Sequence, residues 1–214
     1  MFAKKRVMRR LKISLFFELK DIIVCGVWGI LENFMKNILI IGAARSGKTT
    51  LAKMVHDKFG HSIVSVDAFI SAFQERYPNI GFAHHGKNNH LICPFMVSYT
   101  EALIYNYPEM HFVIEGYHIK PEDAVKYFLN KNFEIVVLGY PQLTVKEAYN
   151  NVRKYEQKFD YTTSIKKEEM CSILEHHIAY SKDCAQKCVE LNLSFYDTSF
   201  NRDEVLNSIM KRIS

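Results

Sequence analysis

Short apolar runs alternate with amphipathic stretches along most of this chain. Five runs, rich in aliphatic, β-branched or aromatic residues, are expected to form strands: Asn37–Ile41, His61–Asp67, Met110–Gly116, Phe133–Gly139 and Leu193–Asp197. Helical patterns separate them, and two of these run from Thr144 to Lys158 and from Lys167 to Leu191. Strands that alternate with helices are typical of a parallel sheet covered on both faces. The pattern therefore predicts a three-layer α/β fold around a five-stranded parallel sheet.

A glycine-bearing loop joins the first expected strand to the next helical pattern. Residues Gly42–Thr49 read Gly-Ala-Ala-Arg-Ser-Gly-Lys-Thr, a complete G-x-x-x-x-G-K-[ST] motif. The helical pattern behind it carries Leu51, Val55 and Phe59 on one face and ends at Gly60. Strand, glycine loop and helix are the context in which this motif binds phosphate, so the sequence predicts a nucleotide site in a P-loop NTPase fold.

Each part of this loop has an expected contact with the nucleotide. Backbone N–H groups and the helix N-terminus bind the phosphate oxygens, Lys48 reaches the β- and γ-phosphates, and the Thr49 hydroxyl ligates Mg²⁺. The candidate nucleotide-binding residues here are Gly42, Ala43, Ala44, Arg45, Ser46, Gly47, Lys48, Thr49 and Thr50. The expected cofactors are ATP and Mg²⁺.

The net charge of +5 does not indicate a nucleic-acid partner. Residues 1–36 hold eight basic and three acidic residues, which account for the whole excess. The remaining 20 basic and 20 acidic residues balance, so the part with the glycine loop offers no basic surface for a polyanion. The scattered set of five cysteines favours reduced thiols and a cytoplasmic location.

Residues 1–34 form an N-terminal extension with a basic start and two apolar runs, Ile13–Phe17 and Ile22–Leu31. The first run is too short to span a bilayer, and no small-residue cleavage site follows the second. A membrane-surface helix and an upstream extension from an early start codon both remain open, since Met35 directly precedes the first expected strand. Residues 35–214 form the expected domain.

Two acidic residues stand at the carboxyl ends of expected strands, where open α/β sheets bind ligands. Asp67 ends the second strand and suits an acceptor hydroxyl that faces the γ-phosphate, whose proton it accepts or whose oxygen it orients. Asp67 also suits the N-cap of the following helix. Glu115 ends the third apolar run where a Mg²⁺-binding acid is expected, with a plain solvated acid as the alternative.

The motif and the strand pattern resemble the P-loop kinases of small molecules, the nucleoside-monophosphate-kinase and shikimate-kinase-like proteins. The run Glu115–Pro121 is also similar to the EG-x-H turn of phosphoglycerate-type and related kinases, a match too short to indicate a substrate. The resemblance covers about residues 36–213. It implies five parallel strands, an acceptor-binding region after the second strand (residues 68–94) and a lid after the fourth (residues 153–168). It also implies that Asp67 serves the acceptor hydroxyl or helps to hold Mg²⁺.

The same resemblance assigns residues in the second half of the chain. Arg153 suits a catalytic lid cation that closes over the γ-phosphoryl group, although a charged exposed helix is the other interpretation. The turn up to Asn201 falls where such kinases contact adenine. Residues 68–94 contain His84, His85, His90 and Cys93, whose spacing fits a polar acceptor-binding loop better than a zinc site.

Three function classes compete on this sequence. The first is an ATP- and Mg²⁺-dependent phosphotransferase with Lys48, Asp67 and Arg153 as catalytic residues and Thr49, Asp67 and Glu115 around the metal. The second, a regulatory GTPase, requires an Asn-Lys-x-Asp guanine-reading motif that the chain lacks. The third is a nucleotide-binding regulator or ATPase without transfer to a small molecule, and it needs no acceptor site. The first is expected, with a small-molecule acceptor that the sequence does not identify.

Overall fold

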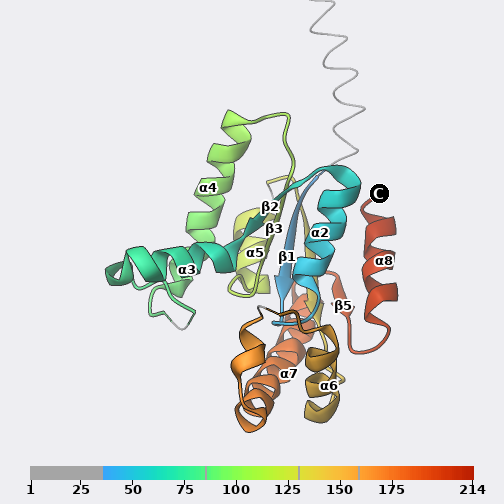
Figure 1. The fold of residues 1–214 in the computed structure, drawn as a ribbon. Helices are drawn as coiled ribbons and strands as arrows, with labels where there is room; N and C mark the ends of the chain where they lie inside the picture. Colours follow the sequence, from blue (N-terminus) through green and yellow to red (C-terminus); the bar gives the residue numbers. More distant parts are fainter. Residues whose placement is uncertain (1–35, 85, 130, 159) are drawn as a thin grey trace, which may run out of the picture. The chain divides into compact units, whose positions relative to one another are not determined.

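The computed structural model describes residues 36–84, 86–129, 131–158 and 160–214 (Figure 1). The chain divides into two units, Met1–Lys36 and Asn37–Ser214, and every element below belongs to the second. The apolar runs of the N-terminal extension lie outside the described residues. No helix in the described part of the chain is both long and apolar enough to cross a membrane.

A five-stranded parallel sheet forms the middle layer. In spatial order its strands are β2 (Ser62–Ser65), β3 (Phe112–Gly116), β1 (Asn37–Gly42), β4 (Phe133–Gly139) and β5 (Phe195–Asp197). All four neighbouring pairs are parallel. The central strand β1 is buried along its whole length, as expected for a strand that helices cover on both faces. This architecture confirms the predicted fold.

Alternate residues of the strands face two different helix layers. On one face, Ile38 and Ile40 pack with α2 (Lys48–Phe59) and α8 (Arg202–Arg212). On the other, Leu39 and Ile41 face a core that four further helices complete. Those helices are α3 (Val66–Arg76), α4 (Ile92–Asn106), α5 (Pro121–Phe128) and α7 (Lys167–Glu190). Figure 1 shows α2 and α8 on one side of the sheet and α4 and α5 on the other.

The two predicted insertions take the form of short helices and turns. Residues after β2 form α3 (Val66–Arg76), followed by the 3-10 turns η1 (Pro78–Ile80) and η2 (Asn89–Leu91). Residues after β4 form α6 (Val145–Tyr155) and the turn η3 (Tyr161–Ser164), which leads into α7. Both insertions follow strands whose carboxyl ends lie at the same edge as the glycine loop, because all strands are parallel.

The second strand is shorter than predicted, and this changes the place of Asp67. β2 ends at Ser65, whose last sheet partner is Glu115. Ser65 is the N-cap of α3, because its hydroxyl accepts a hydrogen bond from the backbone N–H of Ala68. The interpretation of Asp67 as the last strand residue or as the N-cap was therefore wrong. Asp67 lies in the first turn of α3, still directly beyond the strand.

Gly42, the last residue of β1, allows the glycine loop to turn against β4. Its φ is 120°, and a Cβ added there would lie 1.9 Å from the carbonyl oxygen of Leu138. The next residue, Ala43, donates its backbone N–H to that same oxygen at 3.0 Å. A side chain at position 42 would therefore separate the loop from the sheet.

We expect Gly42→Ala to lower the free energy of unfolding by at least about 3 kcal/mol, because the added methyl group strains the backbone and clashes with Leu138. Gly60→Ala is the matched control, since Gly60 has a φ of 75° but open space around its Cβ position. It is expected to cost only about 1 kcal/mol. Urea unfolding monitored by circular dichroism measures both, and equal losses would contradict the role given to the Leu138 contact.

Helix α7 buries a histidine beside the ring of Tyr117. His177 is 9% exposed, the two ring centroids are 5.4 Å apart, and its Nδ1 has no hydrogen-bond partner among the described residues. Burial lowers the pKa of His177 to about 4, and the charges of His176 and Lys48 act in the same direction. Below the ordinary value of 6.5 the unfolded chain therefore binds a proton that the folded protein excludes.

Stability is expected to fall as the pH is lowered from 6.5 to 4, with His177 contributing roughly 3 kcal/mol to the loss at the lower limit. In His177→Gln this contribution is absent, so the variant loses less stability over the window. Urea unfolding at pH 7, 5.5 and 4 compares the two proteins, with the exposed His90→Gln as control. Parallel losses in the wild type and His177→Gln would contradict the assignment.

Candidate active site

The lysine of the glycine loop is buried at the start of α2. Lys48 is 6% exposed, and its Nζ donates a hydrogen bond of 2.7 Å to the carbonyl oxygen of Ala43 across the loop. Burial lowers the pKa of Lys48, while the carboxylates of Asp67 and Glu115 oppose that shift. The ammonium group is thus held out of water near two acids, at the loop where a phosphate chain is expected to bind.

The threonine of the motif contacts the predicted metal-binding acid. Thr49 Oγ1 donates a hydrogen bond of 3.3 Å to Oε2 of Glu115, which is 4% exposed in β3. β3 lies directly beside β1, with Ile40 opposite Glu115, and this pairing brings Glu115 to the glycine loop. A hydroxyl and a carboxylate are ligand types that Mg²⁺ prefers.

Asp67 adds a second carboxylate to this centre. Its Oδ1 is buried without a hydrogen-bond partner among the described residues, and it lies 3.8 Å from Nε2 of His118. The Asp67 side chain as a whole is 43% exposed, so only this oxygen is shielded, and a metal ion or a hydroxyl bound at Oδ1 would give it a partner. The donor set of Thr49, Glu115 and Asp67 fits Mg²⁺.

The protein alone does not complete a metal cage here. In the described ranges, no group of three or more His, Cys, Asp or Glu side chains is arranged to hold a metal ion. A magnesium ion at this site would therefore take its remaining ligands from water and from nucleotide phosphates, which is usual for Mg²⁺.

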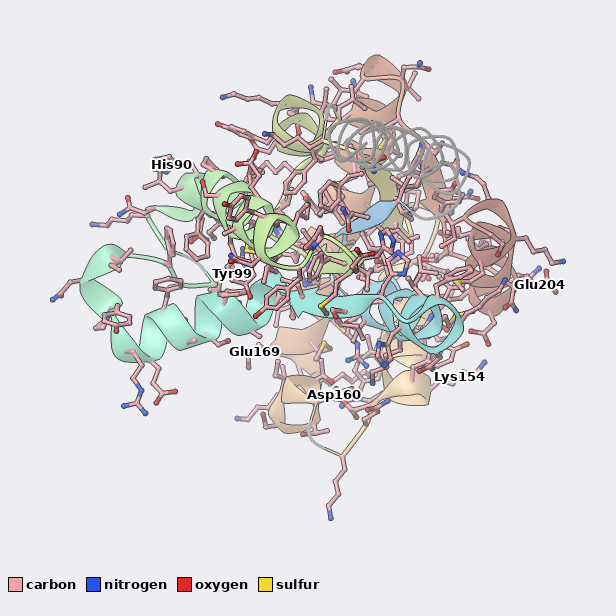
Figure 2. All side chains as sticks on the ribbon, turned by 90° about the horizontal axis from the view of Figure 1, so that it is seen from above. His90, Tyr99, Lys154, Asp160, Glu169 and Glu204 are labelled. Atoms are coloured by element: carbon pink, nitrogen blue, oxygen red, sulfur yellow. The ribbon has the colours of Figure 1, made fainter. Side chains whose placement is uncertain are left out.

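A cavity of about 910 Å³ opens beside the glycine loop. Its walls are the loop, α6, the turn after α6 and the segment after β5. Residues that line it include Lys48, Thr50, Lys53, Lys154, Tyr155, Gln157, Asp160, Ser199, Asn201 and Arg202. Asn201, the predicted adenine contact, therefore lines the cavity. In Figure 2, the cavity residues Lys154 and Glu204 lie on the opposite side of the view from His90 of the predicted acceptor region and from Tyr99 of α4.

Two residues of this cavity were not predicted from the sequence. The Arg202 guanidinium lies 4.4 Å from the ring centroid of Tyr155 and donates a hydrogen bond of 2.6 Å to Thr50 Oγ1. It thereby joins α8 to α6 and α2 around the cavity. The sequence indicated a cavity role for Arg202 only through its position directly after Asn201. The contact between Tyr155 and Arg202 joins positions far apart in the sequence, so no local pattern could predict it.

An ion pair connects the glycine loop to the lid segment. Arg45 Nη1 lies 2.8 Å from Oδ2 of Asp160, and both side chains are about three-quarters buried, at 21% and 26% exposed. Burial opposes ionisation of Asp160, but hydrogen bonds from the backbone N–H of Gln157 and from Arg45 hold its pKa below the ordinary value. Sequence reasoning had identified Arg45 but not its partner.

Arg153, the predicted lid cation, has a different set of contacts. It donates hydrogen bonds to both carboxylate oxygens of Glu156 and to the carbonyl oxygens of Thr162 and Ile165. Its Nε also donates to the Tyr149 hydroxyl. These contacts hold the turn between α6 and α7. The structure therefore brings Lys48, Thr49, Asp67 and Glu115 together and pairs Arg45 with the predicted lid segment. Arg153 instead contacts residues of α6 and of the turn that follows it.

Solved structures share this fold. A gluconokinase from Sinorhizobium meliloti 1021 superposes with a TM-score of 0.57 at 12% identity, over 84% of this chain and 92% of its own. A shikimate kinase from Bacteroides thetaiotaomicron superposes with a TM-score of 0.52 at 13% identity, over 84% of this chain and 98% of its own. A sugar kinase from Janibacter sp. HTCC2649 superposes with a TM-score of 0.55 at 16% identity, over 83% of this chain and 93% of its own.

No protein-family model matches the sequence, and no curated protein matches it significantly. At identities of 12–16% the structural likeness concerns the fold alone. This chain has the fold of the P-loop small-molecule kinases.

Proposed function

We propose that this protein is an ATP- and Mg²⁺-dependent kinase that transfers the γ-phosphoryl group to a hydroxyl group of a small molecule. The observation that carries the proposal is the convergence of Thr49, Glu115 and the orphaned Oδ1 of Asp67 on the buried ammonium of Lys48. The absence of an Asn-Lys-x-Asp guanine-reading motif supports ATP as the donor.

The residues divide the chemistry between them. Lys48 binds the β- and γ-phosphate oxygens and neutralises charge that builds on them during transfer. Thr49, Glu115 and Asp67 would hold Mg²⁺, which supplies further charge neutralisation when it is bound. As the acceptor oxygen forms its bond to the γ-phosphorus, the bond from that phosphorus to ADP breaks. Asp67 orients the acceptor hydroxyl and accepts its proton at Oδ1.

A nucleotide-binding regulator without transfer activity is the alternative. It would use Lys48, Thr49 and the cavity of about 910 Å³ in the same way. It would have no use for the Asp67 carboxylate oxygen that has no hydrogen-bond partner among the described residues. The lack of a hydrogen-bond partner for Asp67 Oδ1 therefore favours phosphoryl transfer over nucleotide binding alone.

The cysteines and the charge of the chain bear on the compartment and the partner of the proposed enzyme. Cys93, Cys171, Cys184 and Cys188 are free thiols, which supports our proposal of a reducing compartment such as the cytoplasm. The balanced charge of residues 37–214 supports a small-molecule partner and not a nucleic acid. We further propose that residues 68–94 bind the acceptor and that residues 153–168 act as the lid.

Asp67→Asn is expected to lower kcat by about 10²- to 10⁴-fold, because the amide cannot accept the hydroxyl proton. ATP affinity is expected to stay within about threefold of the wild type, since the change preserves shape and hydrogen bonding. Lys48→Ala is the comparison and loses both ATP binding and transfer. ADP release over a panel of hydroxylated acceptors gives kcat, and calorimetry gives ATP affinity.

Transfer by Asp67→Asn at the wild-type rate would rule out its role as base. If the wild type binds ATP tightly but releases no ADP with any acceptor, the regulator alternative is correct.

The roles of the loop cation Arg45 and the candidate lid cation Arg153 can be separated by a pair of substitutions. Arg45→Ala is expected to lower kcat by roughly 10²-fold, because it removes a cation beside the phosphates. Arg153→Ala is expected to lower the melting temperature instead, because its hydrogen bonds hold the turn after α6. Steady-state kinetics and differential scanning fluorimetry measure the two effects. A large loss of kcat in Arg153→Ala with an unchanged melting temperature would support the original prediction for Arg153.

A further inference from the structure

A row of polar groups runs from the surface of the acceptor region to Asp67. The Ser71 hydroxyl lies 3.2 Å from Nε2 of His84, and Nδ1 of His84 lies 3.3 Å from Nε2 of His118. That same His118 nitrogen lies 3.8 Å from Asp67 Oδ1. The row joins three segments: α3, the loop after η1 and the turn after β3. His84 and Ser71 are exposed, whereas the His118 side chain is 7% exposed.

The two ends of this row, Asp67 and Ser71, lie on one face of helix α3. Asp67 and Ser71 are four residues apart in the helix, and Gln74 follows three residues later, so the three share one face. These side chains are a carboxylate, a hydroxyl and an amide. Ser71 uses one of its three hydrogen-bonding positions for His84, and Asp67 Oδ1 uses none. The face therefore has capacity left for a ligand.

Aromatic rings on the opposite side of α3 hold the helix in position. The Phe73 ring meets Phe82 at 5.2 Å and Phe95 at 5.3 Å between centroids, both edge to face. Phe69 meets Tyr99 on α4 at 4.8 Å, and Figure 2 shows Tyr99 beside α3. These contacts fix α3 against α4, so the spacing between Asp67 and Ser71 is set before a ligand binds.

The described arginines all have partners away from this row. Arg45 pairs with Asp160, Arg76 with Glu75, Arg153 with Glu156, Arg202 with Thr50 and Tyr155, and Arg212 with Glu134. Lys87 and Lys120, the lysines nearest in sequence to His84 and His118, are exposed. In the described part of the chain, the row therefore offers no bidentate guanidinium, the group best suited to a carboxylate or phosphate.

Resting on the proposed kinase function, we propose that the acceptor is an uncharged polyhydroxylated molecule, a sugar or polyol. One hydroxyl faces Asp67 and receives the phosphoryl group, and a second bonds to Ser71 one helical turn away. Hydroxyls suit this row because they both donate and accept, as do the serine and the imidazoles. A carboxylate only accepts, and it would face the Asp67 carboxylate without a guanidinium to bind it.

Acceptors that differ only in charge test this assignment. ADP release is measured with ATP and Mg²⁺ over the pairs glucose and gluconate, glycerol and glycerate, and galactose and galactonate. The expected result is a kcat/KM at least about tenfold higher for the neutral member of each active pair. Equal or higher values for the acids would overturn the neutral-acceptor assignment and leave the kinase proposal intact. No ADP release with any hydroxylated acceptor would overturn both.

Variants of the row test its place in acceptor binding. Ser71→Ala is expected to raise the KM for the neutral acceptor roughly three- to tenfold, with the KM for ATP unchanged, because one hydrogen bond is lost. Ser71→Thr, which keeps the hydroxyl, is expected to retain most of the affinity. Ser98→Ala on the exposed face of α4 is the matched control and should change neither constant. An unchanged acceptor KM in Ser71→Ala, at a wild-type melting temperature, would overturn the assignment.

Discussion

The removal of the Lys48 ammonium from water is the constraint around which this site is arranged. A buried cation is costly unless other groups replace its hydration, and the structure supplies them from separate elements. Ala43 provides a carbonyl oxygen within the loop, while Glu115 on β3 and Asp67 on α3 provide opposing charge. The order β2-β3-β1 places those two elements beside the loop. The same groups that stabilise the lysine are those that a phosphate chain and a metal ion would use.

The two halves of the site meet at Asp67 and differ in character. On the proposed nucleotide side, the cavity is lined by five cations against three acids, Asp160, Asp203 and Glu204, an excess that suits a polyanion. On the proposed acceptor side, the row from Asp67 to Ser71 contains imidazoles and a hydroxyl. This asymmetry is chemically sensible for a kinase, because the donor carries the negative charge and the proposed acceptor carries none. Asp67 belongs to both halves.

The sequence predicted whatever depends on local pattern. Short apolar runs between helical patterns located the five strands, and the glycine motif located the phosphate loop with Lys48 and Thr49. The end of β2 was misplaced because an apolar run does not show that Ser65 turns out of the strand to cap α3. The partnership of Arg45 and Asp160 crosses 115 positions of sequence, and no local signal could reveal it. The row through His84 and His118 is equally non-local, since three segments meet only in the folded chain.

Arg45 has a φ of 65°, a left-handed conformation that is unusual for a residue with a side chain. The loop therefore carries a conformational cost that glycine would avoid, and the contact with Asp160 helps to offset it. This makes the lid segment part of what shapes the phosphate loop, although the two are far apart in sequence. A segment grafted in place of residues 153–168 would therefore have to supply a partner for the residue at position 45.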